Sequence, residues 1–234
     1  MKKIFLFLPF CLIFFTACYQ EEKEVKFYGN VDVRTVSLAF RVSGRLETLN
    51  FEETLQRVKI DKKDSYLLSY PFFINYFEEI KILNIENIIL WSYFVYGWMP
   101  TILKRIDLGG INDIVEILQR AKKWIILEKD ELFLLKKYLN NSIIGVSKLL
   151  HFINPELYPI WDSKIAVFLG KKNYRNINNI DSYIEYMDDL QKLGKLILIN
   201  TLWKYLEEKL GYKITNIRTI EFILFQAGNT KNAK

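Results

Sequence analysis

The chain has 234 residues, of which half are hydrophobic and 15% are aromatic, so it is long and apolar enough to fold around a packed core and is not an intrinsically disordered polymer. Its formal net charge is +6, and because residues 1–53 carry basic and acidic side chains in equal number, the excess lies after residue 53. A mildly basic body is compatible with nucleic acid or an anionic membrane as partner, and scattered lysines are also typical of a solvated surface.

Cysteine and histidine are scarce, which restricts the possible chemistry. Cys11 and Cys18 are the two cysteines, and His151 is the single histidine. A disulfide framework, a thiol nucleophile and a zinc or iron–sulfur cluster are therefore excluded after Cys18, and a multi-histidine metal site is excluded throughout. We expect neither a metal nor a cofactor.

The first eighteen residues, MKKIFLFLPFCLIFFTAC, have the order of an export signal. Two lysines precede an apolar run at residues 4–17, which is shorter than the ~20 residues a membrane-spanning helix needs and fits a secretory signal peptide. Residues 15–18, Phe-Thr-Ala-Cys, resemble the lipobox of bacterial lipoproteins. That resemblance implies a lipid on Cys18, which would anchor the protein to a membrane of the cell envelope, facing the periplasm. A secretion signal without lipid and an uncleaved anchor helix are the alternatives.

Residues 19–53 contain a short β-like segment. Apolar side chains recur at spacing two between Val31 and Val42, with one slip, and Ser43-Gly44 predicts a turn. The run from Gly29 to Leu46 resembles the start of HlyD-type periplasmic adaptors (membrane fusion proteins), where it opens the membrane-proximal β domain. That family continues into a long coiled-coil hairpin and returning strands, and no such pattern follows here. We therefore interpret residues 19–53 as a truncated segment and expect no transport partners without the hairpin.

After a junction at residues 54–65, the hydrophobic period changes from two to about 3.6, which predicts an all-α domain over residues 66–230. The predicted fold class is mainly α: a compact bundle of about eight helices preceded by a signal peptide and an incomplete β segment. Asp130 and Ser182 are predicted to begin helices, and Gly211 to end one. The predicted helices are 66–78, 86–98, 111–125, 132–139, 143–153, 163–169, one starting at 182, 196–210 and 217–226.

Polar residues gather in one otherwise apolar stretch, NNSIIGVSKLLHFINPELYPIWDSKIAVFL, residues 140–169. Gly145 precedes Lys148 and His151, an Asn-Pro and a Tyr-Pro pair predict an extended loop, and Asp162 opens the next helix. This order resembles the core of helix-hairpin-helix DNA glycosylases, in which a glycine-containing hairpin leads into a lysine-bearing helix and a Pro-x-Asp loop places a carboxylate at a base pocket. It also resembles uncharacterised bacterial proteins with Ser-Lys-x-Leu-His-Phe followed by Pro-Ile-x-Asp-Ser.

The glycosylase resemblance implies specific roles. Asp162 would stabilise the charged sugar or activate water, and Lys148 would act as a Schiff-base nucleophile if it is desolvated. The predicted binding residues, for base or phosphate, are His151, Ser147, Trp161, Lys164, Lys171 and Lys172.

Each of these residues also has a structural interpretation. Asp162 is a good N-cap, Lys148 fits a solvated helix face, and a lone His151 fits a half-buried, hydrogen-bonded histidine. Tyr158 and Trp161 fit a core.

Three functions remain open, and whether the protein is an enzyme is open with them. In the first, the helical body is a glycosylase-like, nucleic-acid-binding domain behind a foreign export leader. Alternatively, the chain is a non-enzymatic fragment of an HlyD-like efflux adaptor carrying a helical interaction domain, or a purely structural module. DNA lies in the cytoplasm and a lipoprotein signal directs the body outside it, so we interpret the chain as a chimera. If the leader is an artefact of gene fusion, we expect the helical body to be cytoplasmic.

Overall fold

The computed structural model describes residues 60–99 and 101–231. The predicted signal peptide, the lipidation site at Cys18, the β segment and most of the junction lie outside these residues. The described residues all belong to one compact unit.

Within the described ranges the fold is mainly α, as predicted, with ten helices and no strand beyond the isolated bridge between Ile106 and Leu139. The helices are α2 (Ser65–Glu79), α3 (Ile85–Trp98), α4 (Ile111–Lys122), α5 (Lys129–Tyr138), α6 (Ile143–Ile153), α7 (Ser163–Phe168), α8 (Tyr174–Ile177), α9 (Ile180–Leu193), α10 (Ile197–Leu210) and α11 (Asn216–Lys231). None of the helices in this part of the chain has the length and apolarity needed to cross a bilayer.

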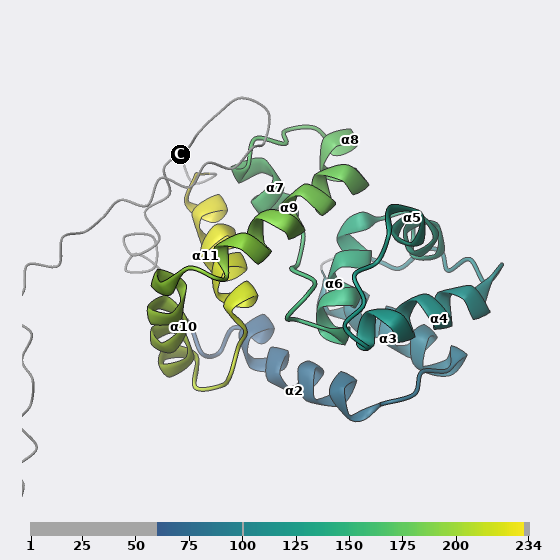
Figure 1. The fold of residues 1–234 in the computed structure, drawn as a ribbon, viewed down its shortest axis with the longest axis horizontal. Helices are drawn as coiled ribbons and strands as arrows, with labels where there is room; N and C mark the ends of the chain where they lie inside the picture. Colours follow the sequence, from purple (N-terminus) through teal and green to yellow (C-terminus); the bar gives the residue numbers. More distant parts are fainter. Residues whose placement is uncertain (1–59, 100, 232–234) are drawn as a thin grey trace, which may run out of the picture. The chain divides into compact units, whose positions relative to one another are not determined.

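Helix α6 is the centre of the first group of helices. It packs against α2, α3, α4 and α5 (Figure 1), and every residue in it except Ile144 is buried. Its sequence, IIGVSKLLHFI, carries apolar residues all round, which is the pattern of a helix covered on all sides. Lys148 and His151 therefore lie in an environment that the rest of α6 makes apolar.

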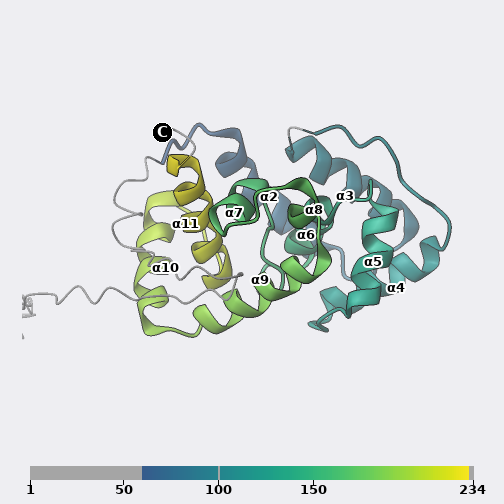
Figure 2. The same cartoon turned by 90° about the horizontal axis from the view of Figure 1, so that it is seen from above.

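Helix α11 is the centre of the second group, which it forms with α7, α9 and α10. Figure 2 shows α9 running from the α10–α11 side of the described unit to the α5–α6 side, and α9 packs on both α11 and α5. The loop between α6 and α7, residues 154–162, therefore leads from one group of helices to the other.

Two glycines allow backbones to approach closely. A Cβ atom on Gly228 of α11 would lie 2.6 Å from the backbone oxygen of Lys164 in α7, and a Cβ on Gly145 would lie 2.6 Å from the hydroxyl of Tyr96. A side chain at either position would force its neighbour to move. Gly145 and Gly228 thus set how closely α6 approaches α3 and α11 approaches α7.

Two predicted helix starts are wrong. α5 begins at Lys129 rather than after Asp130, with the Glu131 carboxylate accepting a hydrogen bond from the backbone N–H of Glu128 at 2.8 Å. α9 begins at Ile180 rather than near Ser182, because the side chain of Asn179 accepts from the Ser182 N–H at 3.1 Å. In each case the capping pattern was placed two or more residues too late along the helix.

The hairpin before α6 also differs from the expectation. The turn is formed by Leu139–Ser142, in which Asn140 and Asn141 have φ values of 57° and 51°. Gly145 instead lies in the first turn of α6, where its N–H donates to the Ser142 side chain. Asparagine tolerates left-handed backbone through local polar contacts, so the turn does not require glycine.

Other predicted boundaries are confirmed. Gly211 ends α10 in the left-handed conformation with φ 83°, α3 ends at Trp98 before the proline at position 100, and Asp162 caps α7. The break predicted at residues 171–179 contains the short helix α8.

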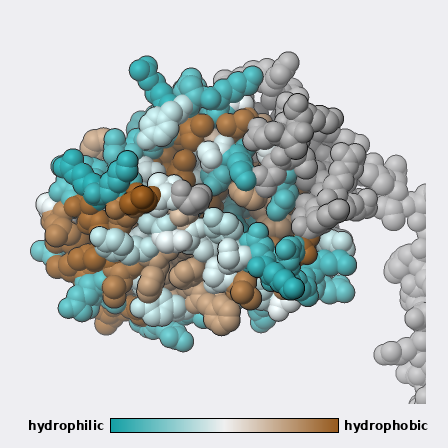
Figure 3. Space-filling model, turned by 180° about the vertical axis from the view of Figure 1, so that it is seen from behind, coloured by the Kyte–Doolittle hydropathy of each residue, from teal (hydrophilic) through white to brown (hydrophobic). Residues whose placement is uncertain are grey.

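Large apolar side chains remain exposed on α2 and α3. Leu68 and Phe72 are 59% and 70% exposed, and Leu90 and Tyr93 are also exposed. Figure 3 shows hydrophobic surface gathered on the half of the described unit that carries α2–α5. Exposed apolar surfaces of this kind mark interaction sites. The face formed by α2 and α3 is therefore a candidate surface for binding a partner.

Candidate functional site

Lys148 and Asp162 meet across two helices. Lys148 projects from the middle of α6 and Asp162 caps the start of α7, and their Nζ and Oδ2 atoms lie 3.3 Å apart. The Lys148 side chain is 8% exposed and that of Asp162 is 18% exposed. Lys148 is therefore desolvated and paired, and the interpretation of a solvated helix face is wrong.

The two carboxylate oxygens of Asp162 make different contacts. Its Oδ1 atom accepts a hydrogen bond from the backbone N–H of Lys164 at 2.9 Å, which caps α7, while Oδ2 faces Lys148. The cap satisfies one of the free N–H groups at the helix start. The cap also fixes the orientation of the carboxylate. The cap and the ion pair therefore favour the same side-chain conformation of Asp162.

Ser147 and Trp161 hold the backbone next to this pair. The Ser147 hydroxyl accepts from the Trp161 backbone N–H at 2.9 Å and donates to the Ile144 carbonyl at 2.8 Å. The Trp161 indole donates to the carbonyl of Ile177 at 2.7 Å. Both residues were predicted to bind ligand; the structure buries both and uses them to hold the backbone next to Asp162.

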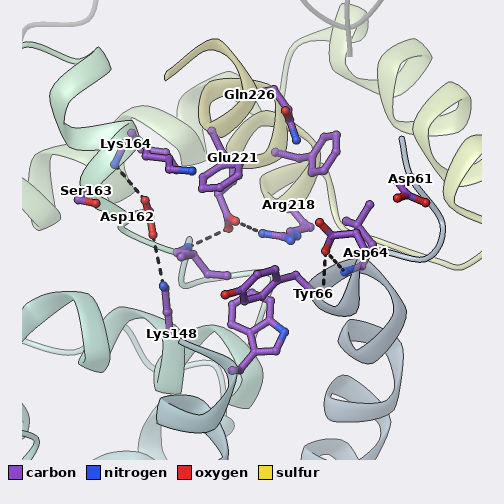
Figure 4. Close-up of a pocket in the computed structure, with 16 residues that line it drawn as sticks. Asp61, Asp64, Tyr66, Lys148, Asp162, Ser163, Lys164, Arg218, Glu221 and Gln226 are labelled. Carbon is purple, nitrogen blue, oxygen red and sulfur yellow. Dashed lines mark hydrogen bonds and ion pairs between the residues drawn. The ribbon is translucent and has the colours of Figure 1, made fainter. Parts of the chain in front are cut away.

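A cavity of about 300 Å³ opens beside the pair (Figure 4). It is formed by the start of α2, the end of α3, the middle of α6, the start of α7 and the length of α11. Its apolar lining is Tyr66, Leu67, Trp98, Ile160, Ile165, Phe222 and Phe225; its polar lining is Asp61, Asp64, Lys148, Asp162, Ser163, Lys164, Arg218, Glu221 and Gln226. The cavity thus combines aromatic walls with charged side chains of both signs, and concave sites of this kind bind small molecules.

A second buried ion pair, Arg218 with Glu221, lies on the α11 side of the cavity. The other Glu221 oxygen accepts from the backbone N–H of Ile160 at 2.8 Å, and the Arg218 guanidinium lies 4.6 Å from the ring centre of Tyr70. Burial raises the pKa of Glu221 to about 7, against the opposing effects of Arg218 and the Ile160 N–H. The loop that carries Asp162 is therefore tied to α11 as well as to α6.

Arg218 and Glu221 were not predicted from the sequence. The available signal was their position in IRTIEFILF, residues 217–225, where two charges of opposite sign at spacing three interrupt an apolar helix. Such a pair faces one side of the helix, and inside an apolar helix that side is a candidate for a buried ion pair.

His151 lies behind the cavity rather than on its surface. Its Nδ1 faces the carbonyl of Tyr158 at 2.8 Å and its Nε2 faces the Tyr70 hydroxyl at 2.9 Å. Since a carbonyl only accepts, Nδ1 carries the proton and Nε2 accepts from Tyr70. Burial, assisted by the nearby Arg218, lowers the pKa of His151 to about 3, so the ring is neutral. Its 3.7 Å approach to Glu221 is then not an ion pair.

Only one of the three predicted phosphate-binding lysines lines the cavity. Lys164 lines the cavity, and its Nζ lies 4.8 Å from the ring centre of Phe225. Lys171 pairs with Glu185 at 3.5 Å, and Lys172 is exposed. Neither Lys171 nor Lys172 belongs to the cavity lining. Among the described residues, no group of three or more His, Cys, Asp or Glu side chains is arranged to hold a metal ion.

The comparisons with known proteins concern only a short part of the chain. Over 34 residues, or 14% of the chain, it is 56% identical to a UPF0194 membrane protein of Yersinia enterocolitica and 50% identical to a UPF0194 membrane protein of Enterobacter. The match covers 10% of each relative, so the chain spans about a tenth of the length of these proteins. A short segment of this chain is therefore similar to membrane proteins.

No family model matches the chain. No solved structure matches it. The glycosylase resemblance of residues 140–169 receives no support from these comparisons and stays a prediction.

Proposed function

We propose that the helical domain binds a nucleobase extruded from nucleic acid and cleaves its N-glycosidic bond, with Asp162 as the catalytic carboxylate. The observation that carries this proposal is the desolvated Lys148–Asp162 pair, 3.3 Å apart, on the wall of a cavity with aromatic sides. Enzymes that act on a base remove it from the stack and hold it in such a pocket.

The lining of the cavity fits a planar, polar ring. Tyr66 and Trp98 lie on one part of the wall, with ring centres 5.4 Å apart at an interplanar angle of 84°, and Phe222 and Phe225 contribute from α11. Aromatic faces stack on any base, at about 1–3 kcal/mol per base. A volume of about 300 Å³ is at the lower end of the range for small-molecule pockets and suits a single base.

Asp162 and Lys148 supply the chemistry. A carboxylate beside the sugar stabilises the positive charge that develops as the glycosidic bond breaks, or accepts a proton from an attacking water. Lys148 offers a second route. Its ammonium gives a proton to Asp162, the resulting amine attacks the anomeric carbon as the bond to the base breaks, and the base leaves with the proton from Asp162. Loss of a proton from the new amine and opening of the sugar ring then give a Schiff base on Lys148. Borohydride traps the second route as a covalent adduct and leaves the first unaffected.

The test uses the full chain and a set of duplexes, each containing one abasic site, mismatch or deaminated base. We expect binding that weakens as salt rises, and release of a base that Asp162→Asn abolishes. Asp181→Asn is the matched control, because Asp181 is exposed in the first turn of α9, where it pairs with Lys129 outside the cavity. Absence of binding to every duplex at low salt would exclude the proposal, as would unchanged base release by Asp162→Asn.

A second candidate follows from the short similarity to membrane proteins. We propose that the leader places the chain in the cell envelope through a lipid on Cys18, facing the periplasm, as a fragment related to HlyD-type adaptors. The helical domain would then be a non-enzymatic interaction module, and the exposed apolar side chains on α2 and α3 support that role.

Two measurements decide between the locations. Cys18→Ser should abolish lipid labelling and membrane retention if the lipobox is used, with Cys11→Ser as the matched control. Peptide mass spectrometry across residues 45–65 should detect junction peptides if the chimera is a natural protein. Without junction peptides in a well-covered sample, the leader is an artefact and the domain is cytoplasmic, where DNA is accessible.

A further inference from the structure

Arg218 is a buried cation that uses only part of its hydrogen-bonding capacity. The residue is 9% exposed, and a guanidinium carries five N–H donors and no acceptor. Within residues 60–99 and 101–231 its side chain donates to Glu221 alone, and none of its nitrogens is among the buried atoms sealed away without a partner. Arg218 also lines the cavity, so a group bound there lies beside a guanidinium with N–H donors that Glu221 does not use.

The neighbours of Arg218 hold it in this position. Glu221 pairs with it three residues later on α11, and the Tyr70 ring lies against the guanidinium with its centre 4.6 Å away. Both contacts restrict the side chain. A desolvated cation with unused donors gains more from a bound acceptor than an exposed lysine does.

Arg218 and Asp162 lie in different parts of the cavity. In Figure 4, Arg218 lies beyond Glu221 as seen from Asp162, on the side that Asp64 and Tyr66 line. A nucleotide whose sugar lies at Asp162 can place its base edge toward Arg218. Asp64 lies on the same side, and its Oδ1 accepts from the N–H groups of Tyr66 and Leu67. Glu221 offers that edge little, because its side chain is 2% exposed and its oxygens face Arg218 and the Ile160 N–H.

We propose that Arg218 is the specificity-determining residue of the cavity and selects bases that present a carbonyl oxygen over bases that present an amino group. The inference rests on the proposed function, since it concerns the base held by the same site. A carbonyl accepts from the guanidinium, whereas an amino group meets it donor to donor and leaves both groups unpaired in a desolvated place.

The test compares bases that differ only in this group. Duplexes carry uracil, cytosine, hypoxanthine or adenine opposite an abasic site, so that every base is unpaired, and affinity is measured by fluorescence anisotropy with the full chain. We expect uracil to bind at least about tenfold more tightly than cytosine, and hypoxanthine more tightly than adenine by a similar factor. A duplex with abasic sites facing each other on both strands reports binding that does not depend on the base.

Arg218→Gln tests the residue itself. Glutamine presents both a donor and an acceptor, so the ratio of the affinities for carbonyl and amino bases should fall to within about twofold, whatever happens to the affinity for duplexes in general. The Arg218→Gln/Glu221→Gln double variant removes the unpaired carboxylate that the single change leaves behind and should behave in the same way.

Each outcome has a separate meaning. Equal affinity of the wild type for all four bases overturns the inference about Arg218 and leaves the proposed function intact. The same holds for a preference that persists in a folded Arg218→Gln variant. If no duplex binds, including the abasic one, the proposed function itself fails.

Discussion

The hydroxyl of Ser147 accepts a hydrogen bond from the backbone N–H of Trp161 at 2.9 Å, and this bond sets Asp162 beside Lys148. The two residues are fourteen positions apart, and the bond lies in the core, where no solvent competes with it. The pair at the cavity wall is therefore built on a buried polar contact one residue away from the carboxylate.

Ser147→Ala tests that contact. The substitution leaves the Trp161 N–H buried without a partner, so the free energy of unfolding should fall by about 1–3 kcal/mol. Urea denaturation measures the change. Ser163→Ala is the control, because Ser163 is exposed at the start of α7 and its removal should change stability by less than about 0.5 kcal/mol. Equal effects of the two substitutions would show that the buried bond contributes nothing.

Two glycine substitutions should have opposite signs. Gly228→Ala puts a Cβ 2.6 Å from the Lys164 carbonyl oxygen and should destabilise the fold by about 1–3 kcal/mol. Gly97→Ala lies within α3 with open space around the new Cβ, and should stabilise it by about 0.5–1 kcal/mol. Thermal denaturation of both variants checks the pair. A stable Gly228→Ala would mean that α7 and α11 are not in close contact.

The two roles of Asp162 are separable by substitution. Asn is as good an N-cap as Asp, so Asp162→Asn should retain the cap of α7 yet lose the charge opposite Lys148. Asp162→Ala should lose both and cost about 1 kcal/mol more in stability than Asn. If Asp162→Asn retained base release in the duplex assay while Asp162→Ala lost stability, the residue would be a helix cap only.

Stability should depend on pH through His151. Its pKa is about 3 in the folded protein against an ordinary value of 6.5, so the unfolded chain binds a proton that the folded one excludes. The resulting contribution of His151 to the free energy of unfolding is complete above about pH 6.5 and is lost as the pH falls toward 3. The free energy of unfolding changes by up to about 1.4 kcal/mol per pH unit in this range.

Glu221 acts in the opposite direction. Its pKa is raised from 4.5 to about 7, so its contribution to stability decreases as the pH rises through this window. In a His151→Gln variant the His151 slope disappears and that of Glu221 remains. We therefore expect urea denaturation between about pH 4 and pH 7 to give a higher free energy of unfolding for the wild type than for His151→Gln, by an amount that grows with pH. A constant difference across this window would contradict a neutral, buried His151.

Local patterns in the sequence predicted the helices well and the site in part. The stripe that begins at residue 111, the cap at Asp162 and the Gly211 terminus follow from short-range spacing, which a single helix determines. The end predicted at residue 125 is wrong, because α4 ends at Lys122 and Trp124 has a φ of 67°. The burial of Lys148 does not. A polar residue on a helix is expected to face solvent, but α6 is covered by four neighbours, and the sequence of α6 alone does not specify them.

The same reason explains why Arg218 was missed. It comes to the cavity from a helix 56 residues beyond Asp162 in the chain, through the packing of α11 on α7. His151 was predicted to bind base or phosphate, with a half-buried, hydrogen-bonded histidine as the alternative. It is fully buried, because Tyr70 and Tyr158 contact its two nitrogens from other parts of the chain. Long-range packing, rather than local pattern, decides which polar residues share the cavity.

The lining of the cavity joins the first and the last described helices, since Asp61, Asp64 and Tyr66 meet Arg218 and Gln226 across it. A bound ligand would therefore link the two ends of the domain, and hydrogen exchange should slow in α2 and α11 together when the site is filled.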